Sequence, residues 1–350
     1  MKTWSIISYL CFTLSFICTS SVIHAEVVNP ATVFDSSNFP EAQRIKIILK
    51  QPENTIDFTR VKFSIDKMVD SSIDIESNLK KIDAIVMTIK SMLTANATSM
   101  DKMLAIKKYL YQAGAWNNYQ PYQYDFNDPK GTLVKNKLLS TYLVTKKGNC
   151  VSMPLLFIAL GQRLGIDVTA STAPTHILVK YTDSETGQTY NLETTSGANF
   201  SRDEWYQQTM HITNQALANR IYLQKLSKQE TLALMAQVLV EDYYGKQEYE
   251  KAMMISDVVL KSYKNAVDAM LMKGSLFYRL LDKNYIKKYP TPNLIPVPER
   301  SYFEFLSINN RYWFEKAESL GWREPTQEDE QNYLKTVEHN ADKLQKNEGK

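Results

Sequence analysis

The 350-residue chain has 3 cysteines and 4 histidines, the residue types best suited to act as nucleophile and base near neutral pH. Two of the cysteines, Cys11 and Cys18, lie in an N-terminal segment with one charge, an apolar stretch of about 15 residues and a small residue, Ala25, at the expected cleavage point. This stretch is shorter than the ~20 residues of a membrane span. We therefore expect a signal peptide whose removal leaves Cys150 as the single cysteine.

Cys150 stands directly before an apolar segment, residues 151–164, which predicts a buried helix. Pro154 fits only the first helical turn, so the helix should begin near Val151. The N-terminus of a helix favours a thiolate, and its free N–H groups can stabilise an oxyanion. Cys150 is therefore placed to be a nucleophile, although a small buried cysteine without a reaction is the common alternative.

His176 is the candidate base, because it begins one of three short strands that follow the apolar segment. With residues 182–187 as a hairpin loop, His176 falls opposite Glu193 on the same face of the sheet. Glu193 would then orient the imidazole, and Asn191, on the same face, is the alternative orienting residue. Isolated histidines and glutamates in strands usually have structural or solvated roles. The order Cys150, His176, Glu193 favours a site nonetheless, since His211 and His339 lie in helical and tail segments.

The elements that must position these residues follow an α+β order. Residues 57–113 have a helical period, a short helix is expected near residues 138–147, and strands are expected at residues 167–172, 176–181 and 190–194. A helical pattern resumes near residue 203 and continues to the end. Its later part has a weak repeat typical of tetratricopeptide helix pairs, interrupted by a proline-rich stretch from Tyr289 to Pro298.

Composition excludes several function classes. A net charge of +3 is too small to indicate a nucleic-acid or membrane-surface partner. The dispersed histidines have no metal-ligand spacing, and no glycine-rich phosphate loop is present, so we expect no metal and no cofactor. No segment after the signal peptide is apolar enough to span a membrane, which predicts a periplasmic or secreted protein.

Several motifs around these residues resemble the transglutaminase-like superfamily. They are Gly148-Asn149-Cys150-Val151-Ser152, Leu164-Gly165, Thr175-His176 and Asn191-Leu192-Glu193-Thr194-Thr195, with Tyr124-Asp125 and Asp128-Pro129 upstream. The greatest similarity is to a bacterial branch in which this core precedes tetratricopeptide repeats. The resemblance implies a papain-like α+β core with a Cys–His–Asp triad, carried here by Cys150, His176 and Glu193, with glutamate in place of the usual aspartate. It also implies a supporting role for Asn136, which matches a polar position of that branch.

We accordingly expect a buried cysteine-bearing helix on a small antiparallel sheet, followed by an all-α repeat region. The expected organisation is a signal peptide (1–25), a leader (26–56), a transglutaminase-like domain with N-terminal helices (57–212), a tetratricopeptide-like helical domain (213–338) and a charged tail (339–350).

The expected function is that of an exported thiol enzyme, a cysteine peptidase, amidase or transamidase, which cleaves or transfers an amide bond of a protein or peptide through a Cys150 thioester. Hydrolysis and transamidation share this intermediate, so the triad leaves both open. The alternative is a catalytically silent scaffold whose helical repeats bind a cell-envelope protein or peptide.

Overall fold

The computed structural model describes residues 34–329, 331–332 and 335. The expected signal peptide and charged tail therefore lie outside the described residues. Among the described helices, none is long and apolar enough to cross a membrane.

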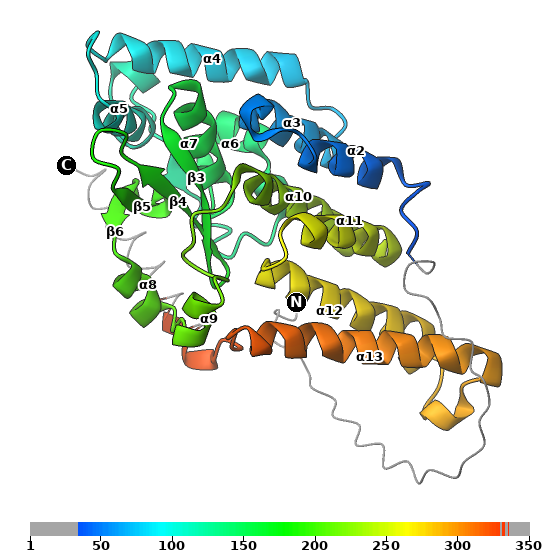
Figure 1. Ribbon diagram of the computed structural model, residues 1–350. Coiled ribbons are helices and arrows are strands. Elements are labelled where there is room, and N and C mark those ends of the chain that lie inside the picture. Colours follow the sequence, from blue (N-terminus) through cyan, green and yellow to red (C-terminus); the bar gives the residue numbers. More distant parts are fainter. Residues whose placement is uncertain (1–33, 330, 333–334, 336–350) are drawn as a thin grey trace.

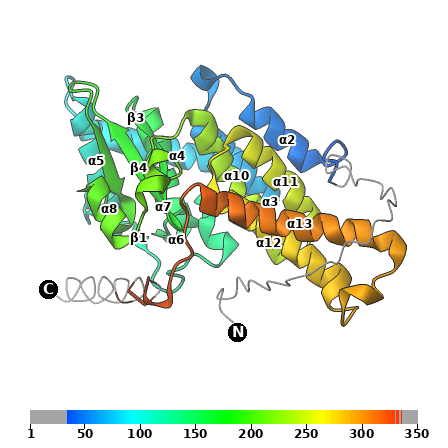
Figure 2. The same cartoon turned by 60° about the horizontal axis from the view of Figure 1, so that its bottom comes forward.

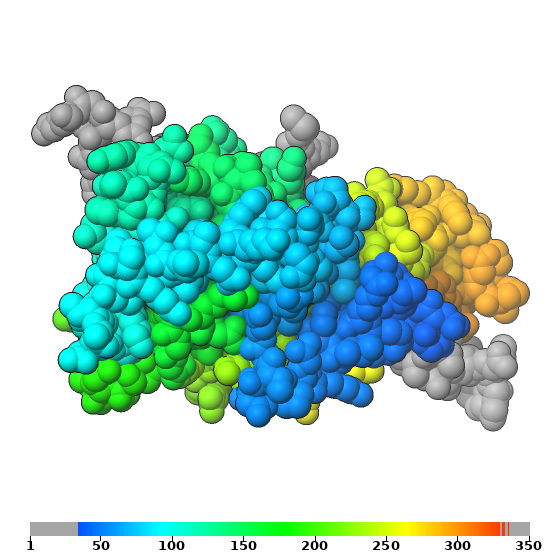
Figure 3. Space-filling view, turned by 90° about the horizontal axis from the view of Figure 1, so that it is seen from above, coloured from blue at the N-terminus to red at the C-terminus, as the bar shows by residue number. Residues whose placement is uncertain are grey.

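Three consecutive helices confirm the helical pattern expected between residues 57 and 113: α3 (Phe58–Val69), α4 (Ile75–Ser91) and α5 (Ser99–Tyr111). Asp57 and Asp74 cap α3 and α4 by accepting hydrogen bonds from backbone N–H groups of the first turn. Thr98 caps α5 in a reciprocal capping box with Asp101. In the view from above, α4, α3 and the preceding helix α2 (Pro40–Leu49) line up across one face of the molecule (Figure 3).

Helix α2 lies within the segment expected to be a leader. Its buried side chains include Ala42 and Ile45, and the helix packs against α10 and α11 (Figure 1). The helix forms because its apolar residues recur on one face, and that face is covered by the C-terminal helices. The apolar residues of this helix are thus part of the hydrophobic core.

Helix α7 (Ser152–Arg163) confirms the predicted buried helix, and ten of its residues are buried. It ends at Arg163, and Gly165 follows with a φ of 72°. The N–H of Ile166 donates to the Gly161 carbonyl at 3.0 Å, so the helix closes with a glycine C-cap. α7 packs against strands β3 and β4 and against helices α5 and α6 (Leu139–Thr145). It is therefore the element around which the sheet and the N-terminal helices assemble.

The main sheet is antiparallel with strand order β3-β4-β5-β6. Its strands are β3 (Asp167–Ala173), β4 (His176–Thr182), β5 (Thr189–Glu193) and β6 (Asn199–Ser201). The first three were predicted, whereas β6 is a three-residue edge strand too short to show a period. A second, parallel pair joins β1 (Gln123–Tyr124) to β2 (Lys147–Gly148), immediately before Cys150.

The predicted register of the second hairpin was wrong by two residues. Val179 faces Leu192 and Thr182 faces Thr189, so the loop spans residues 183–188 in place of 182–187 and His176 is not directly opposed to Glu193. A shift of two residues preserves the face on which each side chain lies, whereas a shift of one would have reversed it. Glu193 therefore lies diagonally across from His176 on the same face.

The helices after the sheet are α8 (Asp203–Thr209), α9 (Asn214–Ala218), α10 (Lys228–Gly245), α11 (Tyr249–Ser262), α12 (Val267–Leu281) and α13 (Val297–Ser319). α10 packs against α11, α11 against α12, and α12 against α13, as Figures 1 and 2 show. α10 also packs against α3, so one hydrophobic core extends from the thiol-bearing helix into the C-terminal helices.

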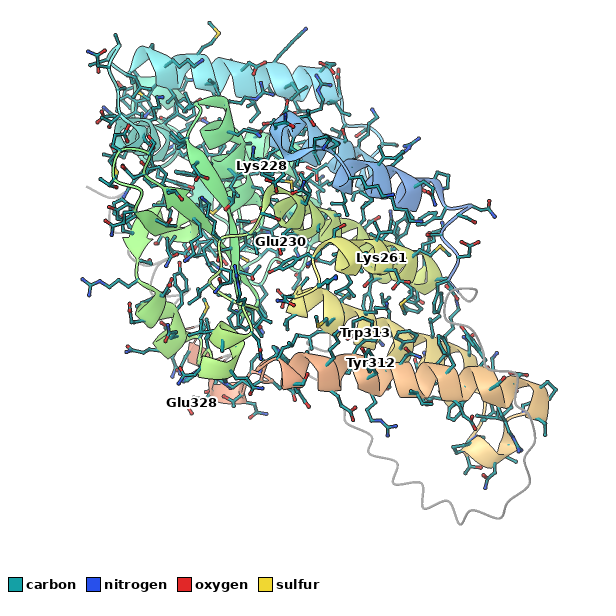
Figure 4. All side chains as sticks on the ribbon, in the orientation of Figure 1. Lys228, Glu230, Lys261, Tyr312, Trp313 and Glu328 are labelled. Carbon is teal, nitrogen blue, oxygen red and sulfur yellow. The ribbon has the colours of Figure 1, made fainter. Side chains whose placement is uncertain are left out.

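The proline-rich interruption separates α12 from α13. A π-helical turn (Asp282–Ile286) precedes it, and a 3-10 turn (Pro292–Leu294) lies within it. Beyond it, Trp313 lies on α13, where Figure 4 labels it. The Lys273 ammonium group of α12 lies over its ring, 4.3 Å from the ring centroid. This contact helps to hold the two helices together across the long connection.

Candidate active site

Cys150 is the one cysteine of the described part of the chain, and its side chain is unbridged and half-buried. It stands in the turn between β2 and α7. The residue before it, Asn149, accepts hydrogen bonds at Oδ1 from the backbone N–H groups of Val151 (3.0 Å) and Ser152 (3.1 Å). Asn149 therefore caps the helix, and Cys150 is held between the capping residue and the first turn.

Gly148 allows this turn to pack closely. A Cβ atom there would lie 2.6 Å from Cε2 of Tyr142 and 2.8 Å from Oγ of Ser152. Both neighbours are buried, so neither can move away without disturbing the core. The glycine of the Gly148–Ser152 motif is thus required by close approach and not by an unusual backbone conformation.

A strained two-residue turn brings His176 to the thiol. Ala173 pairs with His176, which leaves Pro174 and Thr175 as the turn between β3 and β4. Thr175 has a φ of 55°, a left-handed conformation that a β-branched residue rarely adopts. The Thr175 carbonyl oxygen accepts a hydrogen bond from Sγ of Cys150 at 3.8 Å. The turn therefore contacts Cys150 directly at the start of the histidine strand.

The His176 ring connects the thiol to the carboxylate. Its Nε2 lies 2.7 Å from Oε2 of Glu193, and the Cys150 thiol is close enough to contribute to the raised pKa of the ring. His176 and Glu193 are 11% and 8% exposed, so water screens their interaction weakly. The structure thus brings together the three residues proposed from the sequence order.

Glu193 is held by residues that the sequence did not reveal. Its Oε2 also accepts a hydrogen bond from the Tyr206 hydroxyl at 2.8 Å, and its Oε1 accepts from the backbone N–H of Thr195 at 3.0 Å and from the Thr195 hydroxyl. Thr195 could have been found from its place two residues after an acid, a spacing typical of local side-chain turns. Tyr206 comes from α8, and no sequence spacing connects it to Glu193.

The pKa values of the histidine and the glutamate shift in opposite directions. Burial opposes charge on the imidazole, but the negative charge of Glu193 and the hydrogen bonds with Cys150 and Glu193 outweigh it and raise the His176 pKa. Burial also opposes charge on Glu193, but His176, Thr195 and Tyr206 outweigh it and lower the pKa of that carboxyl group. Near neutral pH, the arrangement thus favours an imidazolium–carboxylate pair beside the thiol.

Comparison with known families agrees with this geometry. Residues 76–237 match the model of the transglutaminase-like superfamily. The matched segment begins in α4, contains Cys150, His176 and Glu193, and ends within α10. Searches among curated proteins and among solved structures gave no match.

Two other candidates of the transglutaminase-like domain do not touch the histidine. Asn191 donates through Nδ2 to Asp203 at 2.6 Å. The alternative prediction, that Asn191 orients His176, is therefore wrong. Asn136 donates through Nδ2 to Asp128 at 2.9 Å, and its carbonyl accepts from Asn149 at 3.3 Å. Asn136 thus acts on the turn that carries Cys150 and not on the thiol itself.

The remaining histidines lie elsewhere. His211 follows α8 and pairs through Nδ1 with Asp329 at 2.7 Å, in an exposed contact with the C-terminal segment. His339 lies outside the described residues. Of the two histidines among the described residues, His176 is the one placed at Cys150.

Proposed function

We propose that the protein is a thiol enzyme that cleaves or transfers an amide bond of a protein or peptide, with Cys150 as nucleophile, His176 as base and acid, and Glu193 as the orienting carboxylate. The observation that carries this proposal is the position of the His176 ring, which lies beside the Cys150 thiol and whose Nε2 is 2.7 Å from Oε2 of Glu193. A nucleophile, a base and a group that orients the base are the parts that acyl transfer requires.

Acylation would begin from a Cys150 thiolate beside the His176 imidazolium, which already holds the proton. The thiolate then attacks the amide carbon, a C–S bond forms, and the carbonyl electrons move to oxygen. The backbone N–H of Cys150 has no hydrogen-bond acceptor among the described residues, whereas Asn149 occupies those of Val151 and Ser152. This free N–H can donate to the oxyanion. The C–N bond breaks as the imidazolium protonates the leaving amine.

Deacylation would reverse these roles. His176 removes a proton from water, the resulting C–O bond forms as the C–S bond breaks, and the product acid leaves with Cys150 restored. An amine in place of water gives transamidation by the same steps. Glu193 keeps the imidazole oriented throughout, because both of its oxygen atoms are held by hydrogen bonds.

We further propose that the enzyme is exported to the periplasm or secreted, on the signal-peptide pattern of residues 1–25. We also propose that α10–α13 are two tetratricopeptide-like helix pairs that contact a protein partner. The packing of α10 on α11 and of α12 on α13 supports this. The starts of α10 and α12, Lys228 and Val267, are further apart than the ~34-residue period of such repeats.

The rate of Cys150 alkylation tests the enzyme proposal. In the mature chain Cys150 is the single thiol, so iodoacetamide consumption at pH 5.5 reports it directly. We expect the native protein to react at least tenfold faster than a free cysteine peptide, and His176→Ala to remove this difference. His211→Ala is the matched control and should react as the native protein does. A native thiol as slow as the free peptide would contradict the enzyme and favour the scaffold.

A further inference from the structure

We infer that Asn149 is a positioning residue that fixes the turn carrying Cys150 and caps α7 without placing a negative charge beside the thiol. This inference rests on the proposed thiol chemistry of Cys150. It assigns a specific chemical reason to asparagine at position 149, where aspartate would cap the helix equally well.

Asn149 is hydrogen-bonded to each of the three residues that follow Cys150. Its side chain is fully buried, and its Oδ1 accepts from the N–H groups of Val151 and Ser152, the two residues after Cys150. Its own N–H donates to Oγ of Ser152 at 3.1 Å, and its carbonyl accepts from the N–H of Met153 at 3.1 Å. These hydrogen bonds thus join Asn149, the residue before Cys150, to the three residues after it.

A second set of contacts fixes the Asn149 side chain from outside the helix. Its Nδ2 donates to the Asn136 carbonyl at 3.3 Å, and the Asn136 side chain donates to Asp128 at 2.9 Å. Asp128 is buried and also accepts from the backbone N–H of Thr132 at 2.7 Å. Gly131, with a φ of 57°, lies so close that a Cβ there would be 3.1 Å from Nδ2 of Asn149. The loop therefore determines which way the amide points.

Carboxylates stand at the start of several other helices, as the cap or in the first turn. Asp57 and Asp74 cap α3 and α4, and α5 and α10 each have an acid in the first turn, Asp101 and Glu230. The first turn of α7 has no acid. A carboxylate at a helix start stabilises the helix, but it also opposes a second negative charge nearby. A thiolate at position 150 would be that second charge.

Other ionisable groups around the turn are compatible with this reading. His176 is the one cation that contacts the thiol among the described residues, and Glu193 acts on it from behind the imidazole. The backbone N–H of Asp125 donates to the Gly148 carbonyl. The groups that surround the turn from the neighbouring elements are His176 (β4), Glu193 (β5), Tyr142 (α6), Asp125 and Asp128 (the loop after β1).

The test is the pH profile of iodoacetamide alkylation in full-length mature protein carrying Asn149→Asp or Asn149→Ser. Both replacements keep a capping oxygen, but only aspartate adds charge. We expect Asn149→Asp to move the midpoint of the profile up by about one pH unit, with an alkylation rate about tenfold lower at pH 6. Asn149→Ser should keep the native midpoint. Equal midpoints in these two variants would overturn the inference.

Controls separate this outcome from a folding defect and from failure of the proposed function. Ser227→Asp adds a carboxylate at the cap of α10 and should leave the midpoint unchanged. If Asn149→Asp does not fold, Val151→Asp places the charge on the other side of Cys150 with Asn149 retained, and the same upward shift is expected; an unchanged midpoint overturns the inference. A native thiol with no enhanced reactivity would instead contradict the proposed enzyme.

Discussion

His176 and Glu193 are joined diagonally across the sheet. Their side chains meet at 2.7 Å between Nε2 and Oε2, although the register that pairs Val179 with Leu192 would place Thr195 directly opposite His176. Glu193 stands two residues before Thr195, and its carboxylate extends across that offset to His176. This diagonal geometry explains why a glutamate stands where the family resemblance implies an aspartate, since the longer side chain covers the extra distance.

The first prediction concerns the length of that side chain. Glu193→Asp keeps the charge but withdraws the carboxylate from His176 by about one methylene. We expect the alkylation rate of Cys150 at pH 5.5 to fall about tenfold, close to the fall caused by Glu193→Gln, because orientation is lost in both. Glu185→Asp, in the exposed hairpin loop, is the matched control. A Glu193→Asp protein that reacts at the native rate would contradict the diagonal contact.

The second prediction concerns pH and stability. The raised His176 pKa contributes stability in full below the ordinary histidine value of about 6.5, and this is lost as pH rises through the raised value. The lowered Glu193 pKa contributes stability above the ordinary glutamate value of about 4.3, and this is lost as pH falls through the lowered value. The difference in free energy of unfolding between the native protein and Glu193→Gln should therefore be largest between about pH 4.5 and 6.5.

Urea unfolding at a series of pH values measures this difference. Glu76→Gln provides the control, because its ion pair with Arg60 is exposed and should change stability little at any pH. A Glu193→Gln difference that stays constant from pH 4 to pH 10 would show that His176 and Glu193 do not form a charged pair.

The third prediction concerns the strained turn. Thr175 has a φ of 55°, which glycine adopts without steric cost. We expect Thr175→Gly to raise the free energy of unfolding by about 0.5 kcal/mol, because relief of strain exceeds the added entropy of the unfolded chain. Thr175→Val, which keeps the β-branch, should give no such gain. Chemical denaturation is the measurement, and a less stable Thr175→Gly protein would contradict it.

The fourth prediction concerns Gly148. A methyl group there would overlap the ring of Tyr142, so Gly148→Ala should destabilise the protein by about 1–3 kcal/mol and slow Cys150 alkylation by displacing the turn. Gly245→Ala is the comparison, because nothing lies within 4 Å of the added atom and alanine favours the helix. Equal stability of the two variants would show that the turn can relax around the methyl group.

The sequence by itself determined the local elements. Helices α3 to α7 and strands β3 to β5 follow from apolar spacing, and the start of α7 follows from Pro154, which fits only a first helical turn. The order of Cys150, His176 and Glu193 followed from which reactive residues remain after the expected cleavage and from where they fall relative to these elements. Each of these inferences depends on neighbours in the sequence, and such interactions can be read without the fold.

Tertiary structure decided what depends on partners distant in the chain. The hairpin register was two residues away from the predicted one, because β5 is placed by its pairing with β6 and by packing as well as by its loop. Tyr206 reaches Glu193 from another helix, and Asn136 reaches Asn149 from a loop. Hydrogen bonds between distant segments leave no period in the sequence, since only the packed fold brings their donors and acceptors within 3 Å or so.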